Sequence, residues 1–258
     1  MPRAERLLFP KREHVEDRRK EGQHRKLLDE FFDHATLVTI SRLVTQGQFE
    51  SLDYPISTGK EGGVFRATTP GGYRAVKVYR IGNTVFRRLP AYALEELKRE
   101  SSEGNFARLV YAWTRREHTI LRRMRAAGVG CPEPFGYLRN VLVMEFVGTE
   151  GKPAPRLKDA AVADPDALAR QLEELIRHMV VDARLVHGDL SPYNVLYHEG
   201  HPVLIDVAQS VGVEHPQARA LLRRDSDNFV RYLKREGASL DAEEFFAAIG
   251  GNSFPGRT

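Results

Sequence analysis

Two short segments in the second half of the chain constrain it most. The first, His187–Asn194, places Asp189 and Asn194 five positions apart, and the second, Leu204–Gln209, places Asp206 after an apolar run. Phosphoryl transfer from a nucleotide requires such a set, because one carboxylate orients the attacking hydroxyl while an amide and a second carboxylate hold Mg²⁺ against the phosphates. The alternative interpretation is a pair of aspartate-containing turns between strands, which each segment alone leaves open.

Apolar runs precede both sets of polar residues. Leu185 and Val186 lead into the first segment, and Val203–Ile205 leads to Asp206. Short apolar runs bounded by turn signals predict buried strands. We therefore expect the polar side chains to lie where strands give way to loops.

A lysine in a predicted strand and a glutamate in a predicted helix form a second set. Lys77 lies between Val76 and Val78, and because lysine is depleted in strands this position suggests a function. Glu117 lies in a segment whose apolar residues recur at helical spacing, namely Trp113, Ile120, Leu121 and Met124. A strand lysine of this kind can contact nucleotide phosphates while it pairs with a helix glutamate. The alternatives are an edge-strand solubiliser for Lys77 and an ordinary surface charge for Glu117.

A glycine-rich turn, Ile56–Phe65, precedes that strand. It does not match the Walker P-loop, which requires Gly at the position of Tyr54 and Ser or Thr at the position of Glu61. The protein-kinase G-x-G-x-x-G pattern is also absent. Backbone N–H groups of the turn can still cover phosphates. The candidate nucleotide-contacting residues are Ser57, Thr58, Gly59, Lys60 and Glu61.

The order of these parts resembles the RIO family of atypical serine/threonine protein kinases and, within it, the Rio-one-like subgroup. The resemblance covers about Phe49–Leu233, and the signature His-x-Asp-Leu-Ser-x-Tyr-Asn is matched fully. Subgroup members often have Ala where this chain has Gly62, which touches no presumed reacting group. The motifs that carry the resemblance are Ser57–Glu61, Val76–Tyr79, Trp113 with Glu117, Cys131–Pro134, Leu142–Phe146, His187–Asn194 and Ile205–Gln209.

The resemblance implies an α+β, two-lobed protein-kinase-like fold. Its N-lobe would be an antiparallel sheet with one main helix, and its C-lobe a reduced helical unit, with extra helices at the N-terminus. ATP would bind between the lobes with Mg²⁺ or Mn²⁺. Asp189 would position and help to deprotonate the acceptor hydroxyl, and Asn194 and Asp206 would bind the metal, so that Asp189 and Asp206 are the expected catalytic residues.

The same resemblance assigns the nucleotide contacts. Lys77, paired with Glu117, would hold the α- and β-phosphates. The backbone between Glu145 and Val147 would bind the adenine, and these two residues are the expected contacts. His187 would support the loop geometry rather than transfer protons.

The working role is less constrained than the chemistry. Only 52 residues follow Asp206 and no Ala-Pro-Glu occurs, so the usual peptide-docking platform of protein kinases is not expected. The resembled family is associated with maturation of the small ribosomal subunit, its members can autophosphorylate on Ser, and related members can form a phospho-Asp at the metal-loop Asp. Two alternatives remain: an aminoglycoside-type phosphotransferase, disfavoured by Ser57–Glu61, Tyr193 and the short C-terminal part, and an ATP-sensing ribosome-assembly scaffold.

Composition and charge bound the partners. The single cysteine, Cys131, excludes an intramolecular disulfide, and the sequence has neither a membrane-length apolar run nor an apolar signal segment, so we expect a cytoplasmic protein. Basic clusters attract polyanions, chiefly through phosphate contacts. One such cluster, which predicts a pre-ribosomal particle or its RNA as partner, comprises Arg3, Arg6, Lys11, Arg12, Arg18, Arg19, Lys20, Arg25 and Lys26.

The expected organisation has three parts. Residues 1–50 form a basic helical extension, residues 51–147 the N-lobe with a mobile insertion at about 82–109, and residues 148–258 the reduced C-lobe. Phe135–Leu138 and Val141–Val147 predict a hairpin joined at Arg139–Asn140, and Gly148–Pro155 predicts a linker because of its prolines.

Overall fold

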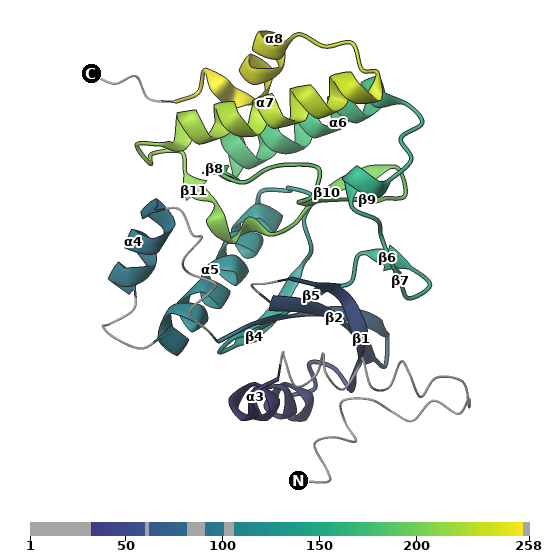
Figure 1. Ribbon diagram of the computed structural model, residues 1–258, viewed down its shortest axis with the longest axis vertical. Helices are drawn as coiled ribbons and strands as arrows, with labels where there is room; N and C mark the ends of the chain where they lie inside the picture. The colour runs from purple at the N-terminus through teal and green to yellow at the C-terminus, as the bar shows by residue number, and fades with distance from the viewer. Residues whose placement is uncertain (1–31, 60–61, 82–90, 101–105, 255–258) are drawn as a thin grey trace. The chain divides into compact units, whose positions relative to one another are not determined.

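The computed structural model describes residues 32–59, 62–81, 91–100 and 106–254, in two compact units (Figure 1). The first unit consists of Met1–His118 with Pro134–Phe146, and the second of Thr119–Glu133 with Val147–Thr258. The boundary falls inside helix α5 (Phe106–Ala126), which contributes to both. The N-terminal basic cluster, Lys60 and Glu61 lie outside the described residues.

The first unit is built on a five-stranded antiparallel sheet in the order β1-β2-β3-β5-β4. The predicted N-lobe sheet is confirmed, and so is the predicted hairpin, because the β4–β5 turn is formed by Arg139 and Asn140. The strands are β1 (Ser51–Thr58), β2 (Gly62–Thr69), β3 (Gly72–Tyr79), β4 (Pro134–Leu138) and β5 (Val141–Glu145).

Helix α3 (His34–Thr45) covers one face of this sheet (Figure 1). Its start is fixed by Asp33, whose carboxylate accepts a hydrogen bond from the Thr36 N–H at 2.7 Å. The helix and the sheet share a core of buried apolar side chains, which consists of Phe32, Ile40, Leu43, Phe49, Leu52, Phe65, Ala67, Val76, Val78, Val141 and Val143. This burial is what attaches the helix that precedes the sheet.

Side chains alternate across a strand, and this alternation places the lysine of β3. Val76 and Val78 enter the core beneath α3, so Lys77 lies on the opposite face of the sheet. The expected insertion at about 82–109 contains α4 (Ala91–Glu100) and the first residues of α5, while residues 82–90 and 101–105 lie outside the described residues.

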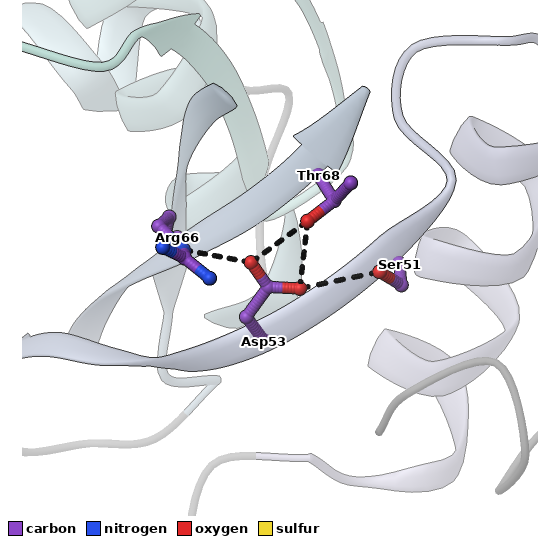
Figure 2. A network of polar contacts seen from close by, with 4 residues as sticks. All are labelled: Ser51, Asp53, Arg66 and Thr68. Atoms are coloured by element: carbon purple, nitrogen blue, oxygen red, sulfur yellow. Dashed lines mark hydrogen bonds and ion pairs between the residues drawn. The ribbon is translucent and has the colours of Figure 1, made fainter. Parts of the chain in front are cut away.

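A polar network joins β1 to β2 where their register shifts. Asp53 lies in the irregular part of β1 between Leu52 and Pro55. Its carboxylate accepts hydrogen bonds from Arg66 Nε at 2.7 Å, from Thr68 Oγ1 at 2.9 and 3.1 Å, and from Ser51 Oγ at 3.2 Å (Figure 2). The network therefore ties the bulged strand to its neighbour in the same hairpin that carries the glycine turn.

The second unit begins with a feature that the sequence interpretation got wrong. We expected Gly148–Pro155 to be a linker, but β6 (Gly148–Thr149) and β7 (Lys152–Pro153) form a small antiparallel hairpin. Glu150 and Gly151 adopt positive φ angles of 52° and 75°, as a tight two-residue turn requires. Pro153 is compatible with this hairpin because a two-stranded ribbon has free edges.

The rest of the second unit combines short strands with long helices, of which α6 and α7 lie side by side (Figure 1). The short elements are the 3₁₀ turns Leu157–Asp159 and Val207–Gln209, β8 (Leu185–Val186), β9 (Val195–His198), β10 (His201–Leu204) and β11 (Val211–Gly212). The helices are α6 (Pro165–Arg177) with a wider turn at His178–Asp182, α7 (Ala218–Glu236), and α8 (Ala242–Phe246) with a wider turn at Ala247–Gly251. Among the described residues, no helix is both long and apolar enough to cross a bilayer.

Candidate functional site

The lysine of β3 and the glutamate of α5 meet inside the first unit. Lys77 Nζ lies 2.7 Å from Glu117 Oε1, and the two side chains are 13% and 2% exposed. A pair this well buried is weakly screened by solvent, and each charge offsets the desolvation of the other. The ammonium group is therefore held in a fixed position by its partner.

Tyr79 completes this pair and was missed by the sequence analysis. Its hydroxyl donates to Glu117 Oε2, and its ring lies 5.0 Å from Lys77 Nζ. Burial, reinforced by the negative charge of Glu117, raises the pKa of the Tyr79 hydroxyl well above its usual value, so the group stays a neutral donor. A signal was present in the sequence, because residues two apart in a strand lie on the same face.

The glycine turn is described only in part. The Gly59 N–H donates to the Gly62 carbonyl at 2.9 Å, which closes the turn between β1 and β2. Thr58 and Gly59 are exposed and Ser57 is half-buried. A Cβ at Gly62 would lie 2.3 Å from the Val78 carbonyl, so β2 approaches β3 at a distance that only glycine allows.

The two residues expected to contact adenine fall in different units. Glu145 ends β5 in the first unit and is exposed. Val147 begins the second unit, and its carbonyl accepts a hydrogen bond from the Ala154 N–H at 3.0 Å. That carbonyl is therefore already engaged by the β6–β7 hairpin.

In the second unit, the β9–β10 hairpin brings the two polar segments together. Asn194 directly precedes β9 and Asp206 follows β10 by one residue, while the Ile205 N–H donates to the Asn194 carbonyl at 3.0 Å. Glu199 and Gly200 form the two-residue turn with positive φ angles of 50° and 82°. The spacing between the segments is thus the length of one tight hairpin.

Asp189 and Asn194 are in direct contact. Asn194 Nδ2 donates to the Asp189 carbonyl at 2.7 Å and to Asp189 Oδ2 at 3.3 Å. Both bonds use the amide nitrogen, so the oxygen Oδ1 of Asn194 remains the atom able to bind a cation. The Asp189 side chain is exposed.

Asp206 has the backbone of a specialised position. Its φ and ψ angles of 58° and 46° are left-handed, a region that non-glycine residues rarely occupy and that aspartate tolerates better than most. A carboxylate and an amide oxygen are suitable ligands for a hard cation. Among the described residues, no group of three or more His, Cys, Asp or Glu is arranged for a metal. Kinase-type metal binding needs fewer protein ligands, because phosphate oxygens complete the coordination.

His187 connects the segment that bears Asp189 with the segment that bears Asp206. The ring is 2% exposed and its Nε2–H donates to the Ile205 carbonyl at 3.0 Å. Burial lowers the pKa of His187, so the ring is neutral and the bond to a carbonyl places its proton on Nε2.

Helix α7 holds the loop that bears Asp189 through a buried carboxylate that the sequence analysis missed. Asp225 Oδ2 accepts from the Gly188 N–H at 2.8 Å, and Oδ1 accepts from the Leu190 N–H at 3.1 Å. The two N–H groups flank Asp189. Two other α7 side chains take the matching carbonyls: Arg224 donates to that of Gly188, and Asn228 Nδ2 to that of Leu190 at 3.3 Å.

Asp225 is 1% exposed, and burial raises its pKa to about 7. The sequence did carry a signal for it, since Asp225 falls three and four positions after Leu222 and Leu221 on the apolar face of a predicted helix. A carboxylate in such a place must serve a buried donor.

Comparison with known proteins places the chain. A family model described as the RIO domain matches residues 63–245. The RIO-type serine/threonine-protein kinase Rio1 of Haloferax volcanii is 39% identical over 238 residues, which are 91% of this chain and 81% of that protein. Human serine/threonine-protein kinase RIO1 is 36% identical over 236 residues, 89% of this chain but 42% of the human protein. The chain therefore spans most of the archaeal relative and less than half of the human one.

A solved structure supports the fold. The Rio2 kinase of Chaetomium thermophilum, described as an ADP/Mg²⁺-phosphoaspartate complex, matches with a TM-score of 0.64 at 22% identity and covers 83% of this chain and 66% of that one. The expected α+β kinase-like fold is thereby confirmed.

Proposed function

Because the chain belongs to the RIO family of serine/threonine protein kinases, we propose that this phosphotransferase transfers the γ-phosphoryl group of ATP to a serine or threonine hydroxyl, with Mg²⁺ or Mn²⁺ as cofactor. The observation that carries the proposal is the arrangement around Asp189. An exposed carboxylate is fixed beside Asn194, and both precede the loop that bears Asp206. ADP and Mg²⁺ in the Rio2 structure support the choice of ATP and Mg²⁺.

Each residue has a distinct part in this reaction. Asp189 accepts a hydrogen bond from the acceptor hydroxyl and orients it for attack. Asn194, through Oδ1, and Asp206 hold the metal, which neutralises charge on the phosphates. Lys77, fixed by Glu117, binds phosphate oxygens, with Ser57, Thr58, Gly59, Lys60 and Glu61 as cover and the backbone at Glu145 and Val147 as the adenine contact. Most of the rate gain comes from positioning and charge neutralisation.

The test separates binding from transfer. Asp189→Ala should retain ATP affinity within a few-fold while phosphoryl transfer falls by about 10²–10⁴, the usual worth of a positioned acid–base group. Asp227→Ala is the matched control, because Asp227 is an exposed aspartate on α7. Transfer by Asp189→Ala close to that of the unmodified chain would reject the catalytic assignment.

For the biological setting, we propose a cytoplasmic role in maturation of the small ribosomal subunit, with autophosphorylation on Ser. Support comes from the resembled family and from the basic residues in the first 26 positions. ATP turnover should rise when small-subunit particles are added. Replacing Arg18, Arg19 and Lys20 with Ala should flatten the salt dependence of particle binding while ATP affinity stays constant. Salt-independent binding, or brisk phosphorylation of an aminoglycoside instead, would contradict this role.

A further inference from the structure

The two oxygens of the Asp189 carboxylate have different surroundings. Oδ2 accepts from Asn194 Nδ2 and from Gln209 Nε2, each at 3.3 Å. Within the part of the chain that the structure describes, no donor lies within hydrogen-bond distance of Oδ1. One oxygen is thus held by two carboxamides, and the other is left for an incoming donor.

Gln209 reaches Asp189 from the metal loop. It ends the 3₁₀ turn Val207–Gln209, which follows Asp206 directly. Val207 and Ala208 are buried, and the Ser210 N–H closes the turn on the Val207 carbonyl at 3.0 Å. Asp206, directly before this turn, has left-handed backbone angles. The side chain of Gln209 therefore extends from a fixed backbone.

A second donor on the same oxygen has a physical purpose. The terminal torsion of an aspartate is broad and roughly two-fold, so a single bond leaves the carboxylate free to rotate. Asn194 is also the expected metal ligand, and its position can change when a cation binds. A carboxamide on a separate loop fixes the carboxylate without adding the positive charge that would lower its basicity.

From this geometry we infer that Gln209 is a positioning residue for phosphoryl transfer, which holds Asp189 so that Oδ1 faces the acceptor hydroxyl. The inference rests on the proposed function. Because Gln209 lies three residues after Asp206, its bond also fixes the hydroxyl-orienting carboxylate relative to the metal loop. Gln209 acts through Asp189 and touches neither substrate nor metal in this scheme.

Two substitutions of similar length distinguish this role from others. Gln209→Met keeps the length and removes the donor, and Gln209→Glu puts a second carboxylate against Asp189. Gln217→Met is the matched control, because Gln217 is an exposed residue at the start of α7. With the full chain, ATP, Mg²⁺ and casein as acceptor, we measure kcat, KM for ATP, nucleotide Kd and the melting temperature of each variant.

We expect the kcat of Gln209→Met to be lower than that of the wild type by about 10–100-fold, the scale of a misplaced catalytic group. The kcat of Gln209→Glu should be lower still. KM and Kd should stay within about three-fold, and Gln217→Met should match wild type. A kcat for Gln209→Met equal to wild type would overturn the inference, as would a loss confined to KM. If Gln209 were instead a metal ligand, Gln209→Glu would have a higher kcat than Gln209→Met and would need less Mg²⁺. That result would also overturn the inference.

If the wild type itself neither bound ATP nor transferred phosphate, the proposed function would fail first. If the melting temperature is reduced only in Gln209→Met, the kcat of Gln209→Glu decides whether the inference holds.

Discussion

The two sets of polar residues are built in opposite ways. In the first unit, Lys77 is buried against Glu117, and both carboxylate oxygens of the glutamate have a partner inside the fold. In the second unit, Asp189 is exposed, and its fixation comes from backbone bonds on either side and from amides on one oxygen. Charge is thus neutralised at the first set and left available at the second.

The difference agrees with the role that we propose for each set. A group that binds phosphates throughout the reaction gains from a permanent partner that fixes it. A group that must accept a hydrogen bond from a changing acceptor cannot have its charge occupied by an ion pair. Its position has to be fixed indirectly, and in this chain the buried Asp225 of α7 supplies that fixation.

The largest effect is expected in the second unit, at the polar residues around Asp189. There, Asp206→Asn should abolish turnover and weaken metal-dependent ATP binding. An amide is a poorer ligand than a carboxylate for a hard cation. Titrating Mg²⁺ and Mn²⁺ against bound nucleotide measures the effect, with Asp182→Asn as an exposed control in the same unit. An unchanged metal dependence would remove Asp206 from the site.

The next largest effect is expected when Asp225, which accepts hydrogen bonds from the backbone on either side of Asp189, is replaced. Asp225→Ala leaves the N–H groups of Gly188 and Leu190 without acceptors, and each such buried group costs about 1–3 kcal/mol. We expect a lower free energy of unfolding in urea and a large fall in kcat. The exposed Asp227→Ala on the same helix should change neither. Equal behaviour of the two variants would show that α7 does not hold the loop.

The pH dependence of stability should report the same carboxylate. Because burial raises the pKa of Asp225 to about 7, the folded state keeps a proton between about pH 4 and 7 that the unfolded state has released. The free energy of unfolding should therefore fall as pH rises through this window, by at most about 4 kcal/mol, and level off above it. Urea unfolding across the window measures the slope, and Asp225→Asn should reduce it. An identical slope in the Asn variant would assign the effect elsewhere.

The smallest effect is expected at the Lys77–Glu117 pair in the first unit. In a double-mutant cycle, Lys77→Ala and Glu117→Ala should show a coupling of about 1–3 kcal/mol in ATP affinity, because each single change already breaks the pair. Tyr79→Phe removes a donor from Glu117 without changing charge and serves as the milder comparison. Full additivity would mean that the pair does not act as a unit on the nucleotide.

Local pattern was sufficient for much of the structure. Alternation predicted the strand around Lys77, helical spacing predicted the segment around Glu117, and apolar runs predicted strands ahead of the segments that bear Asp189 and Asp206. These features depend on neighbours a few positions apart, which is the range over which strand and helix periodicity applies.

Other features depended on contacts that periodicity does not describe. Gly148–Pro155 forms a hairpin because Glu150 and Gly151 can adopt positive φ angles, which outweighs the breaking tendency of the prolines. Tyr79 shares its strand face with Lys77, but only the packing of α5 makes Glu117 its partner.

The sequence by itself determined which chemical groups this protein has and in which order, because each motif is local. Tertiary structure alone decided how those groups are held. Asp225 meets Gly188 across 37 residues and Gln209 meets Asp189 across 20, and such contacts exist only once α7 and the turn Val207–Gln209 have packed against the loop that bears Asp189. The physical reason is that hydrogen bonds between distant segments depend on the burial that brings those segments together.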